Sequence, residues 1–145
     1  MSYDLSKNEA LTLMNKAIQA RNNAYAPYSN FKVGSAVLCE NSRIYSAYNI
    51  ENASYSLCSC AERNALYHAH LSGARNFLAL AVVYHESEFA KPCGSCRQVM
   101  FEFNPDLVLL LCNLKQAYQI VTLSSLLPQA FQGHSIPRSS NMHHE

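Results

Sequence analysis

Charged residues are scarce in this chain, and no segment gathers those that are present. Asp, Glu, Lys and Arg make up 14% of the 145 residues, and 11 basic against 10 acidic side chains give a formal net charge of +1. Proteins that bind nucleic acid usually present a basic face. No cluster of Lys and Arg occurs along this sequence, although folding can bring scattered ones together. The composition therefore disfavours a nucleic-acid partner.

Long hydrophobic runs and a secretion signal are missing too. A membrane-spanning helix needs roughly 20 consecutive apolar residues, and no stretch of this sequence approaches that length. The N-terminal stretch MSYDLSKNEALTLMNKA is polar and then amphipathic, without the charged and then apolar profile of a signal peptide. We therefore expect a cytoplasmic protein with no membrane partner.

Internal repeats and domain boundaries are also absent from the sequence. A chain of 145 residues fits one domain, and a chain of this size buries roughly 70% of the surface that its unfolded form exposes. After Gln132 the sequence is polar and shows no periodicity. We predict a single domain over residues 1–132 and a polar, mobile tail over residues 133–145.

Hydrophobic periodicity predicts the elements of the first half. Ser6 and Glu9 form a capping box, and apolar residues at helical spacing predict a helix over residues 6–22. The segments FKVGSAVLC and RIYSAYNI, joined by the polar ENS, predict an antiparallel hairpin over residues 31–50. A second capping box, Ser59 with Glu62, is expected to open a helix that ends at Gly73.

The second half continues the alternation of helices and strands. FLALAVVY, residues 77–84, is apolar throughout, as expected of a central strand covered by helices on both faces. PCGSCRQVMFEF predicts a third helix, which Asn104 and Pro105 stop. LVLLLC and YQIVTL predict strands separated only by NLKQA, which is too short for a parallel crossover. These two strands should therefore be antiparallel, and SSLLPQAF predicts a short final helix or turn.

Six cysteines in an intracellular chain indicate metal binding, catalysis or burial more often than disulfides. Cys39 and Cys112 lie in apolar, strand-like runs, and Cys58 has no partner at ligand spacing except Cys60. We interpret Cys39, Cys58 and Cys112 as small hydrophobic residues of the core. The cysteines that remain are Cys60, Cys93 and Cys96.

Cys93 and Cys96 form a C-x-x-C motif whose sulfurs lie on one face of a helical first turn, where both can reach one metal ion. The motif alone is also compatible with a redox dithiol. With Cys60 the site would have three thiolates, which leave the fourth tetrahedral position of zinc open, as is typical of a catalytic site. A closed structural site would instead need a fourth ligand. The candidates for it are Cys58, His68 and His85.

Glu62 and Arg63 follow Cys60 closely. A metal ligand, one residue and then Glu, with a later Pro-Cys-x-x-Cys that here begins at Pro92, is the pattern of zinc deaminases. In that pattern the glutamate carries protons and does not bind the metal. Arg63 can donate hydrogen bonds to thiolates and offset their charge. The alternative role of Glu62 is that of a capping partner for Ser59.

Four blocks of the sequence resemble the cytidine deaminase family in its short, homotetrameric, zinc-dependent form. They are AYAPYSNFKVGSAV, NIENASYSLCSCAER, PCGSCRQVMFEF and LLPQAF, in family order, and the resemblance runs from about Ala10 to Phe131. It implies an α/β fold, a three-layer α/β/α sandwich with a five-stranded mixed sheet. It also implies hydrolysis of cytidine and 2′-deoxycytidine to the uridines with release of ammonia, as in pyrimidine salvage.

The resemblance implies roles for individual residues as well. Glu62 would carry the protons, and one Zn²⁺ per subunit would be held by Cys60, Cys93 and Cys96. Asn49 and Glu51 resemble the pair that grips the ribose 3′-hydroxyl, although a polar exit from a strand would explain them too. The implied neighbours of the base are Phe31 and Ala61. For Tyr28, Tyr55 and Phe131 the resemblance implies contacts between the subunits of a homotetramer. Ordinary core packing is the alternative for all three.

Two local features depart from the family pattern. Tyr48 stands where the family more often has a small residue, and residues 84–91, YHESEFAK, match no family block. The rival functions are deamination of a nucleoside antibiotic such as blasticidin S, deamination of a polynucleotide or tRNA base, and a zinc module without activity. The NIEN block, the low net charge and a cysteine rather than a histidine at position 60 favour a free pyrimidine nucleoside as the partner.

Overall fold

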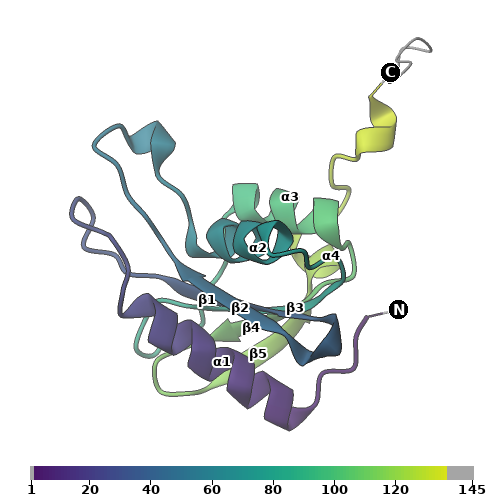
Figure 1. The fold of residues 1–145 in the computed structure, drawn as a ribbon, viewed down its shortest axis with the longest axis horizontal. Helices are drawn as coiled ribbons and strands as arrows, with labels where there is room; N and C mark the ends of the chain where they lie inside the picture. The colour runs from purple at the N-terminus through teal and green to yellow at the C-terminus, as the bar shows by residue number, and fades with distance from the viewer. Residues whose placement is uncertain (1, 137–145) are drawn as a thin grey trace.

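The computed structural model describes residues 2–136 and arranges them in three layers. In Figure 1 helix α1 lies on one side of the sheet, while α2, α3 and α4 lie on the other. The helices are α1 (Lys7–Arg21), α2 (Ala61–Leu71), α3 (Gly94–Phe103) and α4 (Leu123–Leu126). The strands are β1 (Gly34–Cys39), β2 (Ile44–Tyr48), β3 (Phe77–Val83), β4 (Val108–Cys112) and β5 (Tyr118–Thr122). The predicted α/β/α sandwich is confirmed.

The five strands form one mixed sheet in the order β2-β1-β3-β4-β5. β1 pairs antiparallel with both β2 and β3, and β4 pairs antiparallel with β5, as their short connection predicts. β3 and β4 are parallel, with Ala79 opposite Val108, because α3 supplies the crossover between them. The predicted hairpin of the last two strands is therefore confirmed.

The central strands are buried on both faces. Every residue of β1 and β4 is buried, and in β3 only Leu78 is partly exposed. Leu13 and Met14 of α1 pack against one face, and Leu66 of α2 and Met100 of α3 pack against the other. This two-sided burial explains why FLALAVVY shows no alternation of polar and apolar residues.

Gly34 allows α1 to approach the sheet closely. A Cβ atom built at this position would lie 2.0 Å from the carbonyl oxygen of Ala17 and 2.6 Å from the amide nitrogen of Arg21. Both of these atoms belong to the backbone, so no side-chain rotation would relieve the clash. The first residue of β1 therefore has to be a glycine for α1 to pack where it does.

Two of the predicted helix starts have different outcomes. The capping box of α1 is confirmed, since the Ser6 hydroxyl accepts from the Glu9 amide and the Glu9 carboxylate accepts from the Ser6 amide. The box at Ser59 is wrong. Cys60 is the N-cap of α2 without a side-chain capping bond, and the Ser59 hydroxyl instead donates to Asn64 Oδ1 at 2.6 Å.

The described chain ends in a short 3-10 turn, Gly133–Ser135. The rest of the predicted tail, from residue 137 onward, lies outside the described residues. Helices in the described part of the chain all fall short of the length and apolar character that a bilayer crossing requires.

Candidate metal centre

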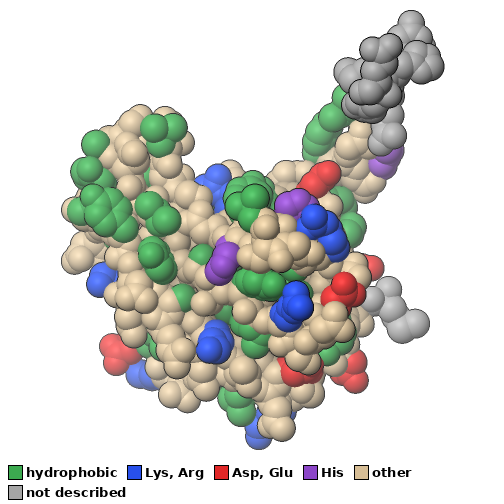
Figure 2. Space-filling view, in the orientation of Figure 1, with side chains coloured by type: hydrophobic (Ala, Val, Ile, Leu, Met, Phe, Trp, Pro, Cys, Tyr) green, Lys and Arg blue, Asp and Glu red, His purple; other side chains and the backbone are tan. Residues whose placement is uncertain are grey.

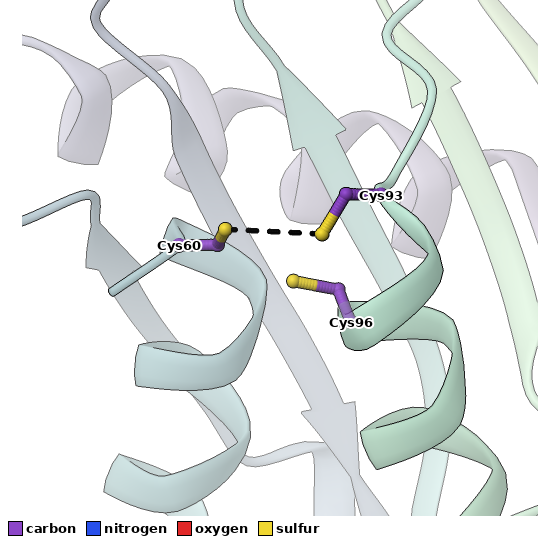
Figure 3. A group of neighbouring side chains, drawn as sticks. All are labelled: Cys60, Cys93 and Cys96. Carbon is purple, nitrogen blue, oxygen red and sulfur yellow. Dashed lines mark hydrogen bonds between the residues drawn. The ribbon is translucent and has the colours of Figure 1, made fainter. Parts of the chain in front are cut away.

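Three cysteine sulfurs meet where two helices begin. Cys60 is the N-cap of α2, Cys93 is the N-cap of α3, and Cys96 lies in the first turn of α3. Their sulfur atoms all lie within 4.8 Å of one another, and the Cys60 and Cys93 sulfurs are 3.9 Å apart (Figure 3). The fold brings them together because α2 leads into β3 and α3 follows it, so both helices start at the edge of the sheet where β3 ends.

The spacing of these sulfurs fits a tetrahedral zinc ion. With a zinc–sulfur distance of about 2.3 Å, two ligands of a tetrahedron lie about 3.8 Å apart, close to the 3.9 Å between Cys60 and Cys93. Three thiolates and the partial positive charge of two helix N-termini are a donor set that zinc accepts. The cluster is therefore suited to hold Zn²⁺.

Within residues 2–136 no fourth His, Cys, Asp or Glu joins the cluster. The Cys58 thiol accepts from the Asn52 amide at 3.3 Å, and the His85 ring accepts from the amides of Ser87 and Glu88. The His68 ring lies 3.3 Å from the Ser46 carbonyl. None of the three candidates for a closed structural site joins the sulfur cluster, so a bound zinc ion would keep its fourth position open to a ligand from outside residues 2–136.

Cys58 differs from its prediction. Cys39 and Cys112 are buried as expected, but Cys58 is only half-buried and faces a pocket. It sits in the loop after β2, where its thiol holds the backbone of Asn52 and does not pack into the core.

Arg63 and the neighbouring thiols set the charge of the cluster. The Cys96 thiol, and after it the Arg63 guanidinium, donate hydrogen bonds that lower the pKa of Cys60 to about 5. The same pairing raises the pKa of Cys96, since its proton is shared with the Cys60 thiolate. Arg63 Nη2 lies 3.5 Å from Cys60 Sγ. The lowered pKa of Cys60 favours its thiolate form, which is the form that binds a metal.

Glu62 is a buried carboxyl group beside the cluster. It lies in the first turn of α2 with 4% of its surface exposed. Burial raises the pKa of Glu62 to about 7, and the adjacent Cys60 thiolate adds to the rise. A carboxyl group with a pKa near neutrality both accepts and returns protons readily. Because Ser59 makes no capping box with it, the capping role for Glu62 falls away.

A pocket of about 240 Å³ opens beside the three sulfurs. Of the candidate metal, catalytic and substrate residues predicted from the sequence, those that line it are Phe31, Asn49, Glu51, Cys58, Cys60, Glu62 and Cys93. Ala61 and Cys96 are fully buried and do not line the pocket. The pocket thus joins the metal centre to the candidate substrate residues.

Sequence reasoning missed several pocket residues. Tyr84 and Lys91 come from the stretch that matched no family block, and Val33 comes from the segment before β1. The ring of Tyr84 packs against that of Phe31 with centroids 5.1 Å apart. The position of Lys91, two residues before Cys93, indicates that it lies near the metal centre.

Asn49 and Glu51 hold the loops that shape the pocket. The Asn49 side chain accepts from the Val33 amide and donates to the Phe31 carbonyl, both at 2.8 Å. The Glu51 carboxylate accepts from the amides of Tyr28 and Ser29 and from the Ser29 hydroxyl. The Ser29 hydroxyl and these amides lower the pKa of Glu51, so the group is ionised.

The three aromatic residues assigned to subunit contacts are exposed. Tyr28 and Tyr55 pack edge to face with ring centroids 6.0 Å apart, yet 46% and 71% of their surfaces are exposed, and Phe131 is 61% exposed. Core packing, the ordinary alternative, is thereby wrong for all three. Figure 2 shows hydrophobic side chains gathered on the projecting lobe formed by the α1–β1 and β2–α2 loops. The large hydrophobic residues exposed on these loops are Tyr25, Tyr28, Phe31, Ile50, Tyr55 and Leu57.

Comparison with known proteins gives consistent matches. A family model described as the cytidine and deoxycytidylate deaminase zinc-binding region matches residues 7–112. A protein named cytidine deaminase from Halalkalibacterium halodurans is 49% identical over 120 residues, which is 82% of this chain and 91% of the relative. The crystal structure of a cytidine deaminase from Burkholderia pseudomallei is 46% identical in sequence, with a TM-score of 0.80. The match covers 83% of this chain and 97% of the Burkholderia chain. The cytidine deaminase structure from Mycobacterium tuberculosis is 37% identical with a TM-score of 0.75, over 89% and 99% of the two chains.

Proposed function

The chain belongs to the cytidine and deoxycytidylate deaminase family, and from this premise we propose that it hydrolyses cytidine and 2′-deoxycytidine to the corresponding uridines and ammonia. The observation that carries the proposal is a three-sulfur cluster with an open fourth position and a buried glutamate in the same pocket. The relatives named above support cytidine as the substrate, and pyrimidine salvage is the metabolic role that such an activity serves.

The residues that would hold the metal are Cys60, Cys93 and Cys96, with one Zn²⁺ per subunit. When bound, zinc supplies a Lewis acid that lowers the pKa of water, which makes water a usable nucleophile near neutral pH. Three thiolates work against that acidity, and Arg63 together with two helix N-termini offsets their charge. The chain itself therefore tunes the metal through groups that do not bind it.

Glu62 moves the protons of the reaction. Its carboxylate takes a proton from the attacking water and passes it to the ring nitrogen of the cytosine. It later carries the second proton of that water to the exocyclic amine, which leaves as ammonia. Its burial in the pocket wall suits this role, because the raised pKa of Glu62 lies close to the working pH.

The remaining pocket residues bind the nucleoside. Phe31, 50% exposed and packed on Tyr84, offers an aromatic face to the base. Asn49 and Glu51 each keep hydrogen-bonding capacity beyond their loop contacts and lie on the pocket wall, where a ribose hydroxyl would reach them. Ala61, which the resemblance also places near the base, is fully buried and is not part of the pocket lining.

An ultraviolet assay with zinc analysis tests the proposal. We expect the purified protein to contain zinc and to deaminate cytidine and 2′-deoxycytidine, with little turnover of blasticidin S or single-stranded RNA. Glu62→Gln should keep its zinc and lose at least about 100-fold in kcat, because general acid–base catalysis is worth roughly that much or more. Full activity in Glu62→Gln would refute the proton-carrying role, and turnover of RNA alone would replace the substrate.

A further inference from the structure

Arg97 ties the loop that enters α3 to the end of α4. Its Nε donates to the Pro92 carbonyl and its Nη1 donates to the Leu126 carbonyl, both at 2.8 Å. Pro92 directly precedes Cys93, and Leu126 is the last residue of α4. One half-buried guanidinium therefore joins the backbone beside a zinc-ligand position to a segment about 30 residues further along the chain.

Gln98 makes the neighbouring connection. Its Nε2 donates to the Phe131 carbonyl at 2.9 Å. Arg97 and Gln98 are consecutive residues of the helix whose first turn carries Cys96, and together they bond the backbone at both ends of residues 126–131. These contacts are the side-chain hydrogen bonds found between α3 and this segment in the described chain.

We propose that Arg97 and Gln98 are positioning residues that couple the metal centre to residues 127–131, and so to the placement of Phe131. The inference rests on the proposed function and adds a link between zinc retention and the C-terminal segment. Arg97 acts on both, because it donates to the Pro92 carbonyl beside Cys93 and to the Leu126 carbonyl at the start of the segment. Gln98 acts on the segment alone.

The geometry gives the two residues different roles. Without the Arg97 side chain the Pro92 carbonyl loses this donor, so the residue before Cys93 is held to α3 less firmly, and the Leu126 carbonyl loses its link to α3 as well. Without Gln98 only the Phe131 carbonyl is released. Residues that orient metal ligands without binding the metal typically change metal affinity by about 10- to 100-fold when they are replaced.

Zinc release and hydrogen exchange test the coupling on the zinc-loaded, full-length protein. Zinc release is followed with the chromogenic chelator 4-(2-pyridylazo)resorcinol, and amide exchange is followed in peptides covering residues 127–136 and β3. The variants are Arg97→Met, Arg97→Lys and Gln98→Met. Arg43→Met is the control, since Arg43 is an exposed arginine on the turn between β1 and β2.

We expect Arg97→Met to release zinc about 10-fold faster or more and to exchange faster in residues 127–131, with β3 unchanged. Arg97→Lys, which can restore one of the two bonds, should release zinc at an intermediate rate. Gln98→Met should loosen residues 127–131 while it releases zinc at nearly the wild-type rate.

The proposal would be overturned if Arg97→Met released zinc and exchanged amide hydrogens at the wild-type rates. It would also be overturned if exchange in β3 rose as much as in residues 127–131, because that would indicate general destabilisation. The proposed function fails separately, if the wild-type protein holds no zinc or does not deaminate cytidine. If the wild type is zinc-loaded and active while Arg97→Met is unaffected, the coupling is refuted and the proposed function stands.

Discussion

The six cysteines occupy environments that give the same side chain opposite chemistry. Burial raises the pKa of Cys39 to about 11 and that of Cys112 to about 12, so both thiols stay protonated in the core. Hydrogen bonds from Cys96 and Arg63 lower the pKa of Cys60 to about 5. The ability of a cysteine here to bind a metal therefore depends on the donors around it.

At the scale of single residues, replacing one sulfur should empty the metal centre. Cys93→Ser removes one of three thiolates, and we expect zinc affinity to fall by more than about 100-fold, beyond the effect of losing a supporting residue. Metal analysis after dialysis against a weak chelator checks this. Cys58→Ser is the matched control, because Cys58 shares the pocket but not the sulfur cluster. Unchanged zinc content in Cys93→Ser would contradict the ligand assignment.

The sequence predicted the cluster of Cys60, Cys93 and Cys96 because the C-x-x-C spacing is local and both parts of the cluster stand at helix starts. The proton-carrying role of Glu62 stays a prediction. The sequence misplaced Cys58, since nothing in it indicates that this thiol would hold the Asn52 backbone at the rim of the pocket. It missed Tyr84, which reaches the pocket through the path of the loop between β3 and α3, and Lys91, whose closeness to Cys93 in the sequence was the one available sign. Side chains positioned by loops carry no periodic signal.

At the scale of elements, the capping box of α1 makes stability depend on pH. Hydrogen bonds from the Tyr3 hydroxyl and from Ser6 lower the pKa of Glu9. The ionised group therefore stabilises the fold above its ordinary pKa of about 4.3, and this contribution is lost as pH falls through the lowered value. Glu9→Gln should cost about 0.5 kcal/mol at pH 7 and nothing measurable in strong acid.

Urea unfolding at the two pH values measures this difference. Glu88→Gln serves as the control, because it removes the same charge from an exposed loop position. An equal loss of stability for Glu9→Gln at neutral and acid pH would show that shape rather than charge matters at this position.

The helices and strands were largely predictable because each has its own pattern. Capping residues, apolar periodicity and the short NLKQA connection fixed their types and the antiparallel final pair. The capping box at Ser59 failed, since Asn64 bonds the Ser59 hydroxyl and also donates to the Tyr48 carbonyl. The need for Gly34 could not be predicted, because it arises from the packing of α1 on β1.

At the scale of the whole molecule, the exposed aromatic lobe favours association. Large apolar side chains exposed together in this way often mark an interaction site. We expect the protein to sediment as a homotetramer, at about four times the 16.2 kDa of one chain. Tyr55→Lys places a charge on the lobe and should yield smaller species with lower activity.

Analytical ultracentrifugation tests this expectation, with Ile120→Lys as the control. Ile120 is 52% exposed on β5, away from the lobe, so its replacement tests whether any new surface lysine disturbs assembly. A Tyr55→Lys variant with the wild-type mass would argue against the lobe as the contact surface.

Cys60 and Cys93 are far apart along the chain, so a metal that binds both would also constrain the unfolded chain. The two residues lie 33 positions apart, with the central strand β3 between them. A metal bound by both residues would close this length of chain into a ring. For a covalent link across a ring of this size, the chain-entropy model gives a stabilisation of the folded state of about 4 kcal/mol, because the unfolded chain loses conformational entropy. The ion that serves the chemistry would thus also stabilise the fold by linking the segments on either side of β3.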